Sequence, residues 1–377
     1  MDWLYHGAPP PEEPRGDAVA WLYDDDDPAP RSRAREVPPA RPAPRPAPRP
    51  KPESDEEPEP KHRFRRVLVV FGLLLTLWLA FLVYTPTHAW NTMSRVDDAP
   101  AGRRPAHQPG TTILLVGTDS REGLSAEQRK RLGTGDAEGA RTDTMLIYHV
   151  PPKGSPALIS LPRDSYLPIP GHKKSKLNAA YAWGGASLLT EAVEDATGLR
   201  LDGYLEIGFG GFVALVDAVG GVEVCLDKPM KDKRANIDLP KGCSNLDGVK
   251  ALGYVRQRYQ DPRGDLGRIE RQREIIGKVI EKLTTPATIL NPVRYWHLCH
   301  SIAVVKRGQE TTLGVMLPVA RSAPGTGRGE VISLTVPISN PSANTPAGSS
   351  VLWDEAKAKA MFGQIAKGDT SGLKKFR

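Results

Sequence analysis

Charged residues stand next to three apolar runs that have the length of β-strands. They form three Arg-Asp pairs: Asp119 with Arg121, Arg141 with Asp143, and Arg163 with Asp164. Ligands gather at strand ends in sheets that are flanked by helices, so these pairs are candidates for one site. A single such pair usually belongs to a solvated loop, but three in a short stretch favour a site.

A denser group of arginines lies in the segment YVRQRYQDPRGDLGRIERQR. Arg256, Arg258 and Arg268 are candidates for phosphate binding, because a guanidinium group donates two parallel hydrogen bonds to an oxyanion. Arg268 and Gln272 are four residues apart and share one face of a helix. The other arginines of the segment are expected on a solvated helix face: Arg263, Arg271 and Arg273.

Together these residues predict a pyrophosphate site. Several converging arginines fit a pyrophosphate better than a single carboxylate. Asp119 and Asp143 supply hard oxygen ligands, and Mg²⁺ binds through one or two carboxylates plus substrate phosphates and water. The sequence has no Walker A motif and no dinucleotide fingerprint, and the glycine cluster GFGGF has little specificity.

The elements that must position the site are strands mixed with helices. The runs TTILLVG, MLIYHV and ALISLP lack polar alternation, which is typical of strands buried on both faces. Helical spacing follows in later segments, and capping signals at Gly198, Gly220 and Asp247 mark helix ends. The pattern predicts a layered α/β domain with helices covering a sheet.

One stretch near the N-terminus predicts a membrane anchor. Residues 67–84 carry no charge and would rise about 27 Å as a helix, close to the apolar thickness of a bilayer. The basic run KHRFRR precedes them, so the N-terminal side is expected in the cytoplasm and the remainder outside it. We predict the following parts: a disordered Pro-rich tail at 1–66, the membrane helix at 67–87, a linker at 88–109, an extracytoplasmic catalytic domain at 110–368 and a tail at 369–377.

Net charge and cysteine content narrow the partners. The net charge is +7, but many cations lie in the N-terminal tail or in the motifs above, which favours anionic membranes or phosphorylated substrates over nucleic acid. Three cysteines are too few for a disulfide scaffold. A Cys225–Cys243 bridge is plausible if the domain is extracytoplasmic, and two unpaired thiols are the alternative.

Seven ordered motifs resemble those of the LytR-CpsA-Psr family. They are ILLVGTDSR, RTDTM, SLPRDSYLPIPG, KLNAAYAWGG, GGVEV, LDGVKALGYVRQR and GDLGRIERQ, and they span residues 113–272. The loop between Asp119 and Arg141 looks longer than the family pattern. The resemblance implies a three-layer α/β/α domain with a central mixed sheet and a long apolar pocket for a polyprenyl chain.

The resemblance also implies an activity and roles for single residues. A glycopolymer would move from a polyprenyl-pyrophosphate carrier to peptidoglycan, in a magnesium-dependent phosphotransfer. Asp119 and Asp143 would hold the metal, and Asp265 would assist as a base. The expected catalytic residues are Arg163, Arg256, Arg258 and Asp265, and the expected pyrophosphate-binding residues are Arg141, Arg163, Arg256, Arg258, Arg268 and Gln272. Four apolar residues either line the lipid pocket or pack in the core: Phe209, Phe212, Leu215 and Val216.

Three other functions compete with glycopolymer transfer. The same site with water as acceptor would make a pyrophosphatase, and binding without turnover would make a lipid-carrier binding protein. A membrane-bound transcriptional attenuator would need a DNA-binding element in the cytoplasmic part, residues 1–66, which lacks helical periodicity. Teichoic acid, capsular polysaccharide and arabinogalactan all stay open as the transferred polymer.

Overall fold

The structure is a computed structural model, and it describes residues 60–121, 125–132, 141–232, 235–257, 265–283 and 285–376. Residues 1–59 of the tail predicted at 1–66, and Arg258, lie outside the described residues. The chain divides into two units, residues 1–63 and 64–377, and the architecture below belongs to the second unit.

A mixed sheet of seven strands forms the centre of the domain, in the order β1-β12-β7-β2-β3-β4-β13. Its strands are β1 (Arg95–Val96), β2 (Thr111–Thr118), β3 (Thr142–Val150), β4 (Ala157–Leu161), β7 (Gly203–Ile207), β12 (Lys306–Gly308) and β13 (Ile332–Thr335). The three predicted runs are β2, β3 and β4, and they pair with one another antiparallel, whereas β7 runs parallel to β2. The prediction of a mixed sheet is confirmed.

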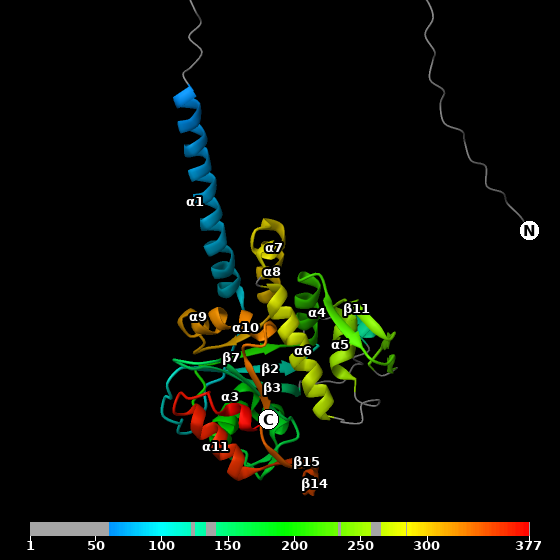
Figure 1. The fold of residues 1–377 in the computed structure, drawn as a ribbon. Helices are drawn as coiled ribbons and strands as arrows, with labels where there is room; N and C mark the ends of the chain where they lie inside the picture. The colour runs from blue at the N-terminus through cyan, green and yellow to red at the C-terminus, as the bar shows by residue number, and fades with distance from the viewer. Residues whose placement is uncertain are drawn as a thin grey trace, which may run out of the picture. The chain divides into compact units, whose positions relative to one another are not determined.

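One face of this sheet packs against helices α3 (Leu177–Thr197) and α11 (Glu355–Ile365), and Figure 1 shows both on the same side of the strands. Leu114, Met145 and Ile147 point into this core and are at most 1% exposed. Helix α3 bends where Gly184 and Gly185 leave helical geometry, and it ends at Gly198, whose φ of 68° is readily adopted only by glycine.

The opposite face is covered by a second set of helices: α2 (Ala126–Leu132), α4 (Phe209–Ala218), α5 (Gly248–Arg256), α6 (Asp265–Leu283), α9 (Leu313–Ser322) and α10 (Pro324–Gly327). Figure 1 shows α4, α5 and α6 side by side on this flank of the sheet. The Asp247 carboxylate accepts the Lys250 N–H at 2.8 Å, so the predicted N-cap of α5 is confirmed. The sheet therefore has helices on both faces, as predicted.

Two small two-stranded sheets complete this flank. Strands β8 (Val222–Leu226) and β11 (Gly242–Leu246) pair antiparallel, as do β9 (Met230–Asp232) and β10 (Ile237–Leu239). Cys225 and Cys243 stand opposite each other on β8 and β11 and are joined by a disulfide. The bridged alternative of the sequence analysis is therefore the one that the structure contains.

The remaining elements lie at the ends of the domain. Helix α1 (Pro60–Thr92) contains a candidate membrane span, Arg63–Thr92, that is long and apolar enough to cross a membrane, and the helix extends beyond the predicted 67–87. Sequence analysis gave no element bounds for α7 (Pro286–Ile289) and α8 (Pro292–Ile302), nor for the hairpin of β14 (Ile338–Thr345) and β15 (Gly348–Trp353). The short pieces β5 (Tyr166–Leu167), β6 (Ser175–Lys176) and η1 (Leu373–Phe376) complete the described structure.

Candidate active site

The three Arg-Asp pairs of the sequence lie at one end of the strands β2, β3 and β4; this end of the strands is called the sheet edge below. Asp119 follows β2, Arg141 precedes the antiparallel strand β3, and Arg163 follows β4, which again runs antiparallel to β3. The end of β2, the start of β3 and the end of β4 therefore coincide. Asp119 and Arg141 also exchange hydrogen bonds: the Asp119 N–H donates to the Arg141 carbonyl at 3.0 Å, and the Arg141 N–H donates to Asp119 Oδ1 at 2.6 Å.

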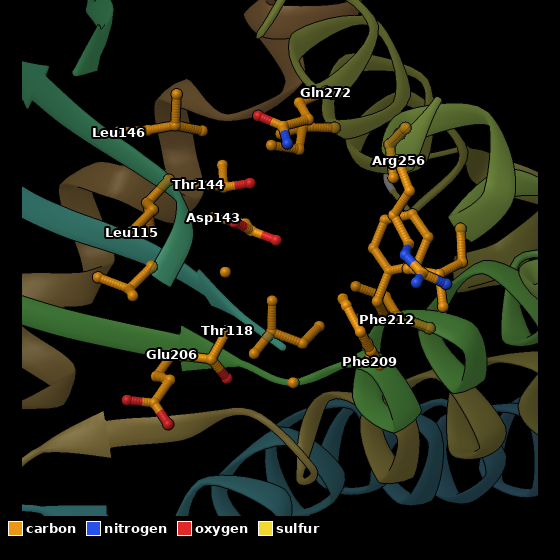
Figure 2. A pocket seen from close by; sticks show the side chains of 18 of the residues that line it. Leu115, Thr118, Asp143, Thr144, Leu146, Glu206, Phe209, Phe212, Arg256 and Gln272 are labelled. Carbon is orange, nitrogen blue, oxygen red and sulfur yellow. The ribbon is translucent and has the colours of Figure 1, made fainter. Parts of the chain in front are cut away.

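A bulge in β3 turns Asp143 toward the covering helices. Gly117 pairs with Thr144 and Thr118 pairs with Thr142, so Asp143 is the extra residue between them. Strand alternation alone would place Asp143 on the same face as Met145, which lies in the closed core. A bulge re-aims a side chain, and Asp143 lines the cavity together with its neighbour Thr144 (Figure 2).

Arg163 is paired directly with that carboxylate. Its Nη1 donates a short hydrogen bond to Asp143 Oδ1, and its Nε lies 3.5 Å from Asp164 Oδ2. Lys176 holds the other Asp164 oxygen at 3.3 Å. Arg163 is 19% exposed and Asp143 30% exposed, so the pair remains accessible to a ligand that enters from the sheet edge.

Arg256, at the end of α5, faces Asp143 across the cavity (Figure 2). Its guanidinium group lies over the Phe209 ring at 5.0 Å and donates to the Leu132 carbonyl at 3.0 Å. Burial lowers the pKa of Arg256, while the charges of Asp143 and Asp119 act in the opposite direction. Arginine stays protonated regardless, so a half-buried cation stands within electrostatic reach of both carboxylates.

Helix α6 contributes a stripe that changes character along its length. Arg268, Gln272, Ile276 and Ile280 are each four residues apart, and all of them line the cavity. With a rise of 1.5 Å per residue, the stripe covers about 18 Å from its cation to its last isoleucine. One wall of the cavity therefore runs from charged to polar to apolar.

The cavity itself has a volume of about 520 Å³. Asp143, Arg256, Arg268 and Gln272 form its polar end, and Figure 2 shows Gln272 above the Asp143 carboxylate and Arg256 across the cavity from it. Its remaining walls are mostly apolar: Leu115, Leu146, Leu205, Ile207, Phe209, Phe212, Leu215, Ile276, Ile280 and Val305. This arrangement suits an amphiphile that has an anionic head and an apolar tail.

Asp119 and Asp143 fit the requirements of a Mg²⁺ site by their chemistry. They offer hard carboxylate oxygens from adjacent strands at the same edge. One of these carboxylates lines the cavity where the arginines lie, which is where a bound phosphate would complete the coordination shell.

The other expected residues lie as follows. Arg141 is exposed at the sheet edge and is not among the residues that line the cavity. Asp265 begins α6, one turn before Arg268, and the position of its side chain, like all of Arg258, falls outside the described part of the chain. Arg268, which is 3% exposed, and Gln272 both lie in the cavity wall, as the helical spacing predicted.

One expectation about a single residue was wrong, and the alternatives left open for α4 are now decided. Arg271 is not on a solvated face: it is 6% exposed, donates to the Gln257 carbonyl at 2.7 Å and lies over the Tyr254 ring. It thereby fixes the end of α5 that carries Arg256. Val216 is fully buried in the core between α4 and α5, whereas Phe209, Phe212 and Leu215 from the same helix line the cavity.

Sequence reasoning missed two acidic residues of the cavity wall. Asp232 is 8% exposed, accepts the Ala235 N–H at 3.2 Å and adds a negative charge near Arg256. Glu206 is 2% exposed and accepts hydrogen bonds from Tyr204 and Tyr181 at 2.8 and 3.0 Å. Asp232 lies in a charged stretch that resembles a solvated loop, and no local signal distinguishes it.

The fold and the cavity together define a class of protein: an α/β domain on a candidate membrane helix, with an arginine-lined cavity that continues into an apolar one. The LytR_cpsA_psr family model matches residues 84–367, and the chain belongs to this family.

Three known proteins illustrate the similarity. The chain is 45% identical over 275 residues to the probable cell wall biosynthesis protein LcpB of Corynebacterium glutamicum, covering 72% of this chain and 65% of that protein. It is 34% identical to the polyisoprenyl-teichoic acid–peptidoglycan teichoic acid transferase TagU of Enterococcus faecalis, covering 59% of this chain and 73% of TagU. The solved LytR-Csp2A-Psr enzyme from Actinomyces oris shares the fold, with a TM-score of 0.57 at 22% identity over 73% of this chain and 96% of that one.

Proposed function

We propose that this protein transfers a glycopolymer from a polyprenyl-pyrophosphate carrier to peptidoglycan. The observation that carries the proposal is the α6 stripe, which joins a phosphate-binding end to an apolar end within one cavity. The printed name of the Enterococcus relative, a transferase from polyisoprenyl-linked teichoic acid to peptidoglycan, supports the same class of substrate. Because the chain spans just under two thirds of the corynebacterial relative, the polymer itself is not assigned.

In this proposal the arginines hold the pyrophosphate and stabilise the charge that grows on the leaving phosphate. Arg256 and Arg268 reach it from the helices, and Arg163 reaches it from the end of β4; Arg141 and Arg258 are the further pyrophosphate ligands of this proposal. Gln272 donates to a phosphate oxygen from the turn of α6 that follows Arg268. The isoprenoid chain lies along Phe212, Ile276 and Ile280.

The transfer step is an in-line displacement at the phosphorus next to the glycan. A hydroxyl oxygen of peptidoglycan forms the new P–O bond, the bond to the bridging oxygen breaks, and polyprenyl phosphate leaves with the electron pair. Asp265, at the start of α6, takes the hydroxyl proton. Asp119 and Asp143 would hold Mg²⁺, which would supply positive charge to the phosphates.

We also propose that α1 anchors the domain with its N-terminal end in the cytoplasm. The helix contains the uncharged apolar run 67–84, and the basic run KHRFRR lies on the N-terminal side of that run. The catalytic domain then lies outside the cytoplasm, next to its peptidoglycan acceptor. A Cys225–Cys243 disulfide is compatible with that compartment.

The test is Arg163→Ala in the full-length protein, with transfer from a lipid-linked glycan to peptidoglycan as the readout. Removal of one charge-stabilising donor is expected to reduce transfer about 100-fold or more. Arg321→Ala, an exposed arginine on α9, is the matched control and should transfer normally. Undiminished transfer by the Arg163 variant would end this assignment.

Two further measurements separate the proposal from its rivals. Product analysis with and without acceptor glycan distinguishes transfer from pyrophosphate hydrolysis. Chelation of divalent metal, followed by addition of Mg²⁺, tests the metal: transfer should stop and then return, and it should not return in Asp143→Ala. Turnover that is indifferent to the chelator would remove Mg²⁺ from the proposal.

A further inference from the structure

The hairpin formed by α7 and α8 exposes an apolar tip. Ile289, Leu290, Val293 and Trp296 are 36, 69, 62 and 37% exposed, and α7 buries none of its residues. Contiguous exposed apolar residues of this kind mark a binding surface for protein, ligand or membrane. The stretch from Lys282 to Gln309 also contains no Asp or Glu, so nothing acidic opposes contact with lipid.

The polar groups of the turn into the hairpin are satisfied by the hairpin itself. The hydroxyls of Thr285 and Thr288 donate to the Lys282 carbonyl at 3.1 and 3.0 Å, at the end of α6. The Asn291 side chain accepts the N–H groups of Val293 and Arg294 at 3.1 and 3.0 Å, which caps α8. A segment that enters a bilayer must satisfy its backbone internally, because hydrocarbon offers no hydrogen bonds.

The hairpin lies against the candidate membrane helix. The Phe81 ring lies 6.0 Å from Tyr295 and 6.4 Å from Trp296, and the Tyr295 hydroxyl donates to the Leu82 carbonyl at 3.0 Å. His300, one turn further along α8, faces His88, one to two turns further along α1. The two helices therefore run in the same direction along this contact.

This direction sets the depth of the tip. Phe81 and Leu82 belong to the uncharged run 67–84, near its C-terminal end. From Trp296 toward Val293 and α7, the chain continues toward the middle of that run, because α8 is parallel to α1. If α1 crosses a bilayer, the apolar tip lies at the level of the acyl chains.

The hairpin is also continuous with the apolar end of the cavity. Ile280 of α6 lines the cavity shortly before the hairpin, and Val305 lines it shortly after. Helix α8 packs on α4, which supplies Phe212 and Leu215 to the same wall. The α7–α8 hairpin thus connects the end of α6 to the segment around Val305, and both of these segments line the apolar end of the cavity.

We propose that the α7–α8 hairpin inserts its apolar tip into the adjacent leaflet beside α1 and forms the passage by which the polyprenyl chain moves from the bilayer into the cavity. The insertion follows from the contacts with α1, and the passage rests on the function proposed above. The carrier then never exposes its isoprenoid tail to water. Moving such a tail from lipid into water costs about 0.8 kcal/mol for each CH₂ group.

Insertion is tested with a fluorescent probe on the full-length protein in phosphatidylethanolamine–phosphatidylglycerol vesicles. An environment-sensitive label on Leu290→Cys, in a Cys299→Ser background, should emit at shorter wavelength and be quenched by lipids brominated on their acyl chains. The same label on Lys359→Cys, exposed on α11, is the control and should report water. Equal emission and equal quenching at the two sites would overturn insertion.

The passage is tested by kinetics on the double variant Leu290→Asp with Val293→Asp. For a full-length carrier in vesicles we expect KM to rise more than 10-fold, while transfer from a short-chain, water-soluble donor is unchanged. The control is Leu313→Asp with Leu317→Asp on α9, where each leucine is 50% exposed and the expected change is small.

The outcomes separate the two proposals. If the wild-type protein transfers glycan from neither donor, the proposed function fails, and the probe experiment still decides insertion. If the wild type transfers glycan from both donors, and the hairpin variant has the same KM as the wild type for the vesicle-bound carrier, the proposal of a passage is wrong. An equal loss in the α9 variant would also overturn it, because general surface apolarity would then explain the effect.

Discussion

The two faces of the central sheet are built from the same strands, but one is closed by helices and the other borders a cavity. On the closed face, Leu114, Met145 and Ile147 meet α3 and α11 in a core that excludes water. On the other face, Leu115, Leu146 and Leu205 meet a cavity of about 520 Å³ that α4, α5 and α6 cover without filling. The first face is closed by its helices, whereas the second face leaves part of its apolar surface available to a ligand.

Neighbouring residues of one strand point to opposite faces of the sheet. Alternation along β3 sends Met145 and Ile147 to the closed face and Thr144 and Leu146 to the cavity. The bulge at Asp143 breaks that alternation where the strand meets the arginines. The sheet thus delivers a carboxylate to the cavity without placing a charge in the closed core, where burial without a partner would be costly.

The largest expected contrast is in stability. Ile147→Ala on the closed face should lower the free energy of unfolding by about 4 kcal/mol, because a fully buried isoleucine leaves a new void. Leu115→Ala on the cavity face should cost about 1 kcal/mol, since its side chain already borders empty space. Denaturant unfolding of the full chain in detergent measures both, and equal losses would contradict the distinction between the faces.

Much of this arrangement could be predicted from the sequence. The uninterrupted apolar runs predicted strands covered on both sides, and the Arg-Asp pairs at their ends predicted the edge where Asp143 and Arg163 meet. The four-residue spacing of Arg268 and Gln272 predicted one helix face correctly. These features depend on residues close together in the sequence, so they can be predicted without knowledge of the tertiary fold.

The features that were missed depend on distant partners. Arg271 was expected in solvent because nothing in its segment reveals the carbonyl of Gln257 or the ring of Tyr254 that bury it. Asp232 acts on Arg256 only because β9 pairs with β10, which contacts α5. The apolar hairpin α7–α8 acquires meaning only from its contact with α1, more than 200 residues earlier in the chain.

A second contrast concerns pH and the closed face. His149 lies two residues after Ile147 on β3, so its side chain is on the same, closed face of the sheet. It is fully buried and contacts the Thr112 hydroxyl at 2.9 Å. Burial lowers the pKa of His149 to about 4, from 6.5. Between these values the unfolded chain binds the extra proton, so stability is complete above pH 6.5 and falls as the pH drops toward 4, by about 3 kcal/mol over the window.

Unfolding of the wild type and of His149→Gln across this window measures the effect. The variant should lose the part of the slope that the imidazole contributes, whatever its stability at neutral pH. Carboxylates titrate in both proteins, so the difference between the two slopes is the readout. Parallel slopes would show that His149 is not protonated on unfolding in this range.

The smallest expected effect is on the cavity face, at the apolar end of the α6 stripe. Ile280→Trp should fill part of that end and raise KM for a long polyprenyl carrier about 10-fold, equivalent to about 1.4 kcal/mol. The turnover number should hold, because Gln272 lies two turns away along the helix, about 12 Å by its rise. Glu281→Trp, on the exposed side of the same turn, is the matched control. A loss of turnover without a change in KM would instead mean that the bulky side chain disturbs the phosphate end, and the two ends of the cavity would then not act separately.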